Sequence, residues 1–179
     1  MFTEKGPESN KSTLKSVIVV IKTRILILLV ILLISMQLQG QLYREIGREE
    51  LLEITGKRND TTFVVNFWAT WCSPCIKEIG YFEEVHRQMR DDKLKVVLIS
   101  LDFPGQADER MVPFLKQKEI SAPVFLMTDL NYNDWIDQVD PSWSGAIPAT
   151  IIFNKNQRIF LEKELSREEL YNYVKQTMN

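Results

Sequence analysis

The apolar residues of the chain form runs that favour strands and spacings that favour helices. Thr61–Trp68 and Leu94–Leu101 are rich in β-branched and aromatic residues, as buried strands are. Between them, Ile76–Met89 repeats apolar residues at helical spacing, and Pro74 stands where a helix can begin. The pattern therefore predicts a strand, a helix and a second strand in succession.

The same patterns continue along the chain. Further helices are predicted over Glu49–Ile54, over Asp108–Lys118, and from the N-cap residue Ser166 through Val174. Further strands are predicted over Pro123–Met127, Ala149–Phe153 and Arg158–Leu161, the last two forming a hairpin. Asn131–Val139 is predicted to be a short helix or a loop.

The resulting order is β-α-β-α-β followed by β-β-α. Alternating units favour parallel strands with covering helices, and a hairpin adds antiparallel strands. We therefore expect an α/β fold with a mixed central sheet and helices on both faces. This single domain is expected to occupy residues 41–179.

The segment before this domain has the pattern of a targeting sequence. The basic residues Lys22 and Arg24 precede an apolar run over Ile25–Met36, which is shorter than the roughly 20 residues of a spanning helix. Residues 1–40 are therefore predicted to be a signal peptide cleaved after Gly40, or else an anchor that tethers the chain through residues 16–36. A buried core helix is the remaining alternative. Either targeting role places residues 41–179 outside the cytoplasm.

Composition and charge narrow the classes of function. A chain of 179 residues suits one domain with an appendage. The chain has 22 Lys and Arg residues, of which five lie in residues 1–40, and 24 Asp and Glu residues, of which two lie there. Residues 41–179 therefore hold 17 basic and 22 acidic residues and carry a net charge of −5. This part of the chain has no basic stripe, and we expect no nucleic-acid partner.

The chain has two cysteines, Cys72 and Cys75, at a predicted strand–helix junction. A disulfide closing so short a loop adds little stability, so chemistry explains the pair better than stapling does. The amino end of a helix favours a thiolate, which is the nucleophilic form of cysteine. Half of a zinc site is the alternative, but a tetrahedral site needs four ligands and His86 is the only histidine. We expect neither a metal nor a cofactor.

Two segments carry a family resemblance. Asn66–Cys75, with the sequence NFWATWCSPC, resembles the active-site segment of the thioredoxin superfamily, and Gly145–Thr150, with the sequence GAIPAT, resembles its cis-proline loop. Glu78, together with Asn66, resembles the exported TlpA/ResA-type branch. The resemblance implies a thioredoxin-like fold and a redox-active Cys72–Cys75 disulfide.

The resemblance also implies roles for neighbouring residues. Pro148 is expected in the cis form, with the backbone of Ile147 available to an extended substrate. Glu78, one helical turn after Cys75, would take up the proton of that cysteine, although it could be an exposed helix charge instead. Trp71 is expected to contact partners or to pack. The more distant tryptophans, Trp135 and Trp143, are expected to be core residues rather than the lining of a groove.

These observations favour a thiol:disulfide oxidoreductase that reduces exported proteins, as in cytochrome c maturation or envelope thiol repair. Its electrons would come from a membrane thiol donor, as the resemblance implies. No cationic side chain stands between Cys72 and Cys75, which favours a reductant. An oxidant or isomerase, and a copper-handling factor that uses both thiolates as ligands, remain alternatives. A peroxidase is the least favoured, because its cysteine needs a different motif.

Overall fold

The computed structural model describes residues 17–18, 21–30, 42–90 and 92–179. The chain divides into two compact units, residues 1–41 and 42–179, which we describe separately. The predicted cleavage position at Gly40 and the last part of the apolar run, residues 31–36, lie outside the described residues.

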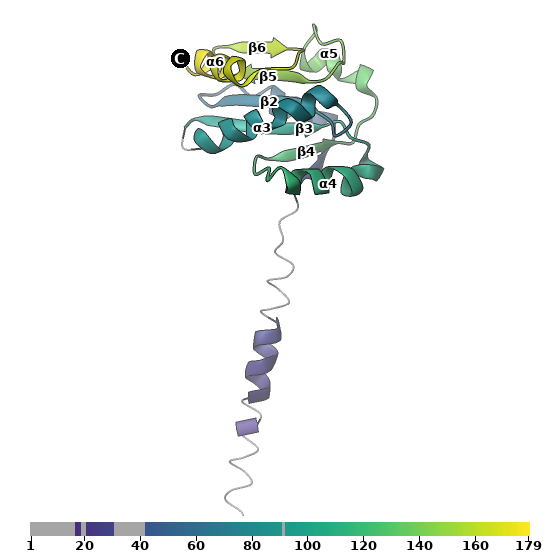
Figure 1. Cartoon of the computed structure of the whole chain (residues 1–179), viewed down its shortest axis with the longest axis vertical. Coiled ribbons are helices and arrows are strands. Elements are labelled where there is room, and N and C mark those ends of the chain that lie inside the picture. The colour runs from purple at the N-terminus through teal and green to yellow at the C-terminus, as the bar shows by residue number, and fades with distance from the viewer. Residues whose placement is uncertain (1–16, 19–20, 31–41, 91) are drawn as a thin grey trace, which may run out of the picture. The chain divides into compact units, whose positions relative to one another are not determined.

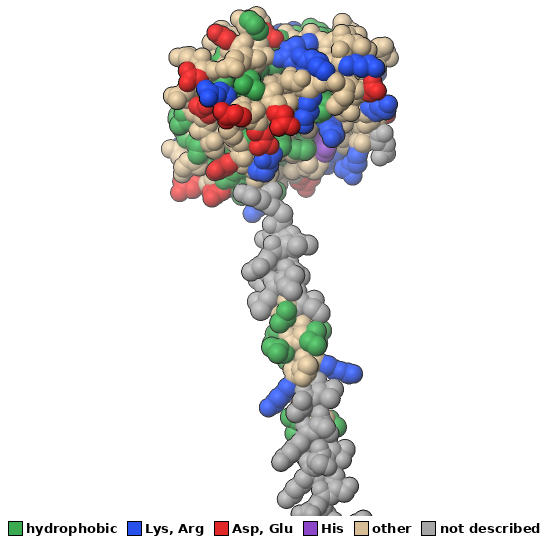
Figure 2. Space-filling view, turned by 180° about the vertical axis from the view of Figure 1, so that it is seen from behind, with side chains coloured by type: hydrophobic (Ala, Val, Ile, Leu, Met, Phe, Trp, Pro, Cys, Tyr) green, Lys and Arg blue, Asp and Glu red, His purple; other side chains and the backbone are tan. Residues whose placement is uncertain are grey.

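In the first unit, residues 21–30 are helical. The apolar side chains of this helix are exposed, and Leu28 reaches 65% exposure (Figure 2). Within the described part of the chain, no helix combines the length and the apolar character needed to cross a membrane.

The second unit is built on a six-stranded mixed sheet with the strand order β1-β4-β3-β2-β5-β6 (Figure 1). Its strands are β1 (Arg44–Ile46), β2 (Thr62–Trp68), β3 (Leu94–Ser100), β4 (Val124–Met127), β5 (Ala149–Phe153) and β6 (Arg158–Leu161). The first four strands in the chain run parallel to one another, whereas β5 and β6 are antiparallel to their neighbours. The predicted combination of a parallel sheet and a hairpin is confirmed.

Helices cover both faces of the sheet, as predicted. They are α2 (Arg48–Thr55), α3 (Ser73–Gln88), α4 (Ala107–Gln117), α5 (Ile136–Val139) and α6 (Arg167–Met178), with 3₁₀ turns η1 (Pro104–Gln106) and η2 (Tyr132–Asp134). One core joins α3, α4 and α6 to the sheet, and a second core joins α2 and α5 to the opposite face. Successive side chains of β2 point to opposite faces of the sheet, so Val64 lies in the first core and Val65 in the second. On the side shown in Figure 2, acidic and basic side chains are interspersed.

Most of the predicted boundaries lie within one residue of the observed ones, and α3 begins at Ser73, three residues before the predicted start of its apolar pattern. Three other features differ from the sequence predictions or complete them. Strand β1 was not predicted, because its three residues are too few to show an alternating pattern. Helix α6 continues to Met178, beyond the predicted limit at Val174. The segment predicted as helix or loop, Asn131–Val139, contains η2 and the short α5.

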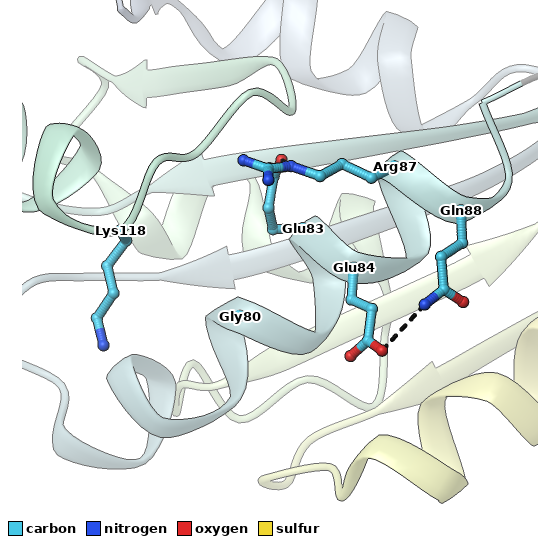
Figure 3. Close-up of a pocket in the computed structure, with 6 residues that line it drawn as sticks. All are labelled: Gly80, Glu83, Glu84, Arg87, Gln88 and Lys118. Atoms are coloured by element: carbon cyan, nitrogen blue, oxygen red, sulfur yellow. Dashed lines mark hydrogen bonds and ion pairs between the residues drawn. The ribbon is translucent and has the colours of Figure 1, made fainter.

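The buried carboxylate of Glu83 fixes α3 to the α4–β4 connection. It accepts hydrogen bonds from the backbone N–H groups of Ser121 and Ala122 at 2.8 and 2.9 Å, and pairs with Arg87 at 2.5 Å. The side chains of Glu83 and Arg87 lie together on α3, one turn beyond Gly80, through which the helix continues (Figure 3). Burial by itself raises the pKa of Glu83, but these hydrogen bonds outweigh it and hold the pKa below its ordinary value.

Replacing Glu83 should therefore destabilise the fold. Glu83→Ala leaves two backbone N–H groups without their acceptor, and we expect a loss of about 3 kcal/mol in the free energy of unfolding. Because the native pKa is lowered, this contribution is present above the unfolded pKa and disappears as the pH falls through the folded pKa. Urea unfolding at neutral and acidic pH measures both effects.

The matched control is Glu84→Ala on the same helix. Glu84 is more exposed and binds Gln88 and Arg167 at the surface, so we expect a change within about 0.5 kcal/mol. Equal losses for the two variants would contradict the assigned role of Glu83.

Candidate active site

Cys72 and Cys75 lie at the amino end of α3, just beyond the central strand β2. Cys72 is the N-cap residue of α3, and its sulfur accepts a hydrogen bond from the backbone N–H of Cys75 at 3.3 Å. The two sulfurs are joined in a disulfide. Cys72 retains 6% exposure, whereas Cys75 is completely buried. A second molecule can therefore reach the pair through Cys72.

A buried carboxylate holds the turn that leads into this pair. Asp102, just after β3, accepts hydrogen bonds from the backbone N–H of Thr70 at 3.1 Å and from its hydroxyl at 2.6 Å. The hydroxyl of Ser100 also donates to Asp102, at 2.7 Å. The sequence analysis did not select Asp102, although a Ser-x-Asp sequence directly after a buried strand is a local signal that could have identified it.

The loop opposite the sulfurs contains the Ile147–Pro148 peptide bond, which is cis as predicted. The carbonyl oxygen of Ile147 lies 3.7 Å from Cys72 Sγ. Within the described part of the chain, the N–H of Ile147 has no hydrogen-bond partner. Gly145 precedes it with a φ of +93°, a conformation that favours glycine. The loop thus presents free backbone groups beside Cys72, the more accessible of the two cysteines.

A second carboxylate holds this loop in place. Glu162, directly after β6, accepts hydrogen bonds from the backbone N–H groups of Ser144 at 3.2 Å and Ala146 at 2.9 Å, and from the Ser144 hydroxyl. Burial by itself raises the pKa of Glu162, but these hydrogen bonds have the larger effect. The pKa of Glu162 is therefore below its usual value. Sequence reasoning missed Glu162, because nothing in its local sequence points to a loop sixteen residues earlier.

Glu78 lies completely buried on α3, one turn beyond Cys75. The backbone N–H of Leu165 donates to its carboxylate at 2.6 Å, and the side-chain amide of Asn66 donates at 3.0 Å. The alternative reading, an exposed helix charge, is wrong. The carboxylate instead connects α3 to β2 and to the segment before α6.

The environment of Glu78 favours its protonated form. Desolvation raises the pKa to about 7, and the hydrogen bonds from Leu165 and Asn66 offset it only in part. Asn66 also donates to Thr150, but its own side-chain oxygen has no partner among the described residues. This buried group therefore titrates close to neutral pH.

The tryptophans differ in their surroundings. Trp71 is 54% exposed beside the sulfurs, as a residue that contacts partners would be. Trp135 and Trp143 are buried, and the ring of Trp143 packs 4.5 Å from that of Phe67, so their predicted place in the core is confirmed. A groove of about 420 Å³ adjoins Trp71 and Ile147, but its other walls come from residues that sequence analysis did not select.

Comparisons with known proteins agree with this arrangement. The model of the AhpC/TSA family matches residues 41–161. The thiol-disulfide oxidoreductase ResA of Bacillus subtilis is 29% identical over 112 residues, which cover 63% of this chain and 55% of that protein. The match thus spans little more than half the length of this relative.

Solved structures share the fold. A thioredoxin-related protein from Neisseria meningitidis serogroup B superposes with a TM-score of 0.56 and 26% identity, covering 65% of this chain and 84% of the other. A thioredoxin-family thiol:disulfide interchange protein from Chlorobium tepidum gives the same TM-score at 21% identity. The match covers 68% of this chain and 82% of the other. The thioredoxin-like fold predicted from the sequence is confirmed.

The raised pKa of Glu78 should appear in the pH dependence of stability. Between about pH 4.5 and 7 the unfolded chain loses this proton while the folded chain keeps it. Stability should therefore fall as the pH rises through this window, by about 3 kcal/mol for the full shift. Glu78→Gln should abolish this decline, and denaturant unfolding of the oxidised protein measures it.

Glu168→Gln, which removes an exposed carboxylate from α6, serves as the control and should follow the wild-type curve. Parallel pH curves for wild type and Glu78→Gln would show that the buried carboxyl does not titrate in this window.

Proposed function

Because the chain belongs to the AhpC/TSA family, we propose that it is a thiol:disulfide oxidoreductase that reduces disulfides in exported proteins. The observation that carries this proposal is the Cys72–Cys75 disulfide, of which one sulfur is reachable and lies 3.7 Å from the cis-proline loop. The similarity to ResA supports the same class of reaction.

In the proposed cycle, the Cys72 thiolate attacks one sulfur of a substrate disulfide. The substrate S–S bond breaks, one substrate thiolate leaves, and a mixed disulfide with Cys72 forms. Cys75 then attacks Cys72 Sγ, which releases the second substrate thiolate and closes the Cys72–Cys75 bond. Two electrons pass from the dithiol to the substrate, whose thiolates take up protons.

The local geometry supports the first step. The amino end of α3 carries a partial positive charge, and the N–H of Cys75 already points at Cys72 Sγ at 3.3 Å. Both interactions stabilise the thiolate of Cys72. Less free energy is therefore needed to remove the thiol proton and form the nucleophile. The free backbone groups of Ile147 would bind an extended substrate segment by strand addition.

The second step requires a proton acceptor for Cys75. Glu78 is buried on the same helix, one turn away, and its pKa of about 7 suits a group that exchanges protons near neutral pH. In this proposal Glu78 receives the Cys75 proton as the mixed disulfide resolves. Desolvation is the main cause of this pKa, so the burial of Glu78 is part of its role.

Features of the sequence support the proposed direction of electron flow and the proposed location. Ser73 and Pro74 stand between the cysteines and contribute no positive charge that would favour the reduced form, so the pair acts as a reductant. The basic and apolar pattern of residues 1–40 directs the domain outside the cytoplasm. In an oxidising compartment a membrane thiol donor would then return the pair to its dithiol form.

Cys75→Ser should trap the substrate. Without the resolving thiol, Cys72 stays covalently joined to its partner, and mass spectrometry of the complexes from the exporting cell identifies it. Cys72→Ser is the control, and it should yield no complexes, because Cys75 is buried. Equal trapping by both variants would overturn the assignment of Cys72 as the attacking residue.

The reduction potential tests the direction. We expect the Cys72–Cys75 couple to equilibrate with glutathione at a potential near the roughly −270 mV of thioredoxin. A value near about −120 mV would instead identify an oxidant. Quantifying the disulfide in redox buffers by thiol alkylation gives the potential.

A further inference from the structure

The groove beside the disulfide is apolar and uncharged. It holds about 420 Å³, within the range of roughly 300–1,000 Å³ for ligand pockets. Aromatic and aliphatic side chains dominate its lining, chiefly Trp71, Phe103, Tyr132, Ile136 and Ile147. None of the lining residues found in the described part of the chain is charged.

Two of these side chains are unusually exposed. Trp71 is 54% and Phe103 is 55% exposed, although large aromatic residues are normally buried. They come from separate segments, one before Cys72 and one after β3, and both line the same groove. Exposed apolar surface gathered around a concave site is typical of binding surfaces.

The groove shares a wall residue with the surroundings of the reacting sulfur. Ile147 forms part of its wall, and the carbonyl oxygen of the same residue lies 3.7 Å from Cys72 Sγ. A substrate segment paired with Ile147 in extended form projects its side chains alternately, about 7 Å apart on one face. A side chain within two residues of the substrate cysteine would therefore lie near the groove wall that Ile147 forms.

Two carboxylates outside the groove hold its walls in place. Asp102 fixes Thr70 on the side of Trp71, and Glu162 fixes Ser144 and Ala146 on the side of Ile147. Across the groove, a Cβ on Gly145 would approach the side chain of Ile136 to 3.2 Å, so the absence of a side chain keeps this corner open. The walls of the groove are thus held by hydrogen bonds to groups outside it.

We propose that this groove selects substrates by the residues flanking their cysteine. It binds a large apolar side chain within two positions of the reacting sulfur and disfavours a charged one, which would lose its hydration against an uncharged lining. This inference rests on the proposed function and specifies its substrate class as cysteines with apolar neighbours.

Symmetric disulfide-linked peptide dimers test the proposal. Three dimers differ only at the two positions on either side of the cysteine, which are Leu, Ser or Asp. Pre-reduced wild-type protein should reduce the Leu dimer about tenfold faster than the Ser dimer, measured as a second-order rate constant, and the Asp dimer should be slowest. Oxidised glutathione, which lacks an apolar flank, provides the reference rate.

Phe103→Ala should remove most of this preference. The rate with the Leu dimer should fall about fivefold, while the rates with the Ser dimer and oxidised glutathione change by less than about twofold. Phe103→Leu should restore the preference, and Phe103→Lys should raise the rate with the Asp dimer. The matched control is Leu130→Ala, which removes an exposed apolar side chain outside the groove and should leave every rate unchanged.

Each negative result has a separate meaning. If wild type reduces the Leu and Ser dimers equally, or if Phe103→Ala slows all substrates alike, the selectivity proposal is wrong and the oxidoreductase proposal stands. If wild type reduces neither the peptides nor oxidised glutathione, the proposed function itself fails.

Discussion

The arrangement of the site depends on the hydrogen bond between the backbone N–H of Cys75 and the sulfur of Cys72. It exists because α3 begins five residues after the end of the central strand β2, with Cys72 as its N-cap. The helix therefore turns its unpaired N–H groups toward a sulfur at the edge of the protein. Since β2 is buried along its entire length, the chain reaches this sulfur from the core of the sheet.

The carboxylates near the site differ in their burial and in their partners. Asp102 and Glu162 each accept several hydrogen bonds from a loop, and act as fixed anchors. Glu78 is the most deeply buried of the carboxylates with a shifted pKa, and its two donors do not compensate for desolvation. The same chemical group thus anchors a loop in two places and has a raised pKa in a third, where burial outweighs its hydrogen bonds.

Local sequence patterns were sufficient to predict part of the structure. The long strands, α3 and the cysteine pair follow from periodicity and spacing, and the cis bond at Pro148 follows from a family resemblance. Glu162 was missed because its partners lie at least 16 residues away in the chain. Asp102 has a local signal in Ser100, but its contact with Thr70, 32 residues away, appears only in the folded chain. The groove was missed for the same reason, since its walls come from segments that only the folded chain brings together.

The partners of Glu78 have a consequence for the order in which the centre is completed. The N–H that binds its carboxylate belongs to Leu165, 87 residues further along the chain, and Glu162 lies in the same late segment. A ribosome releases both cysteines long before these residues exist. A chain that lacks this late segment would still hold Cys72 at the amino end of α3, but the carboxylate of Glu78 would be without its backbone donor. The surroundings of Glu78 are therefore complete only when the segment around Leu165 docks against α3.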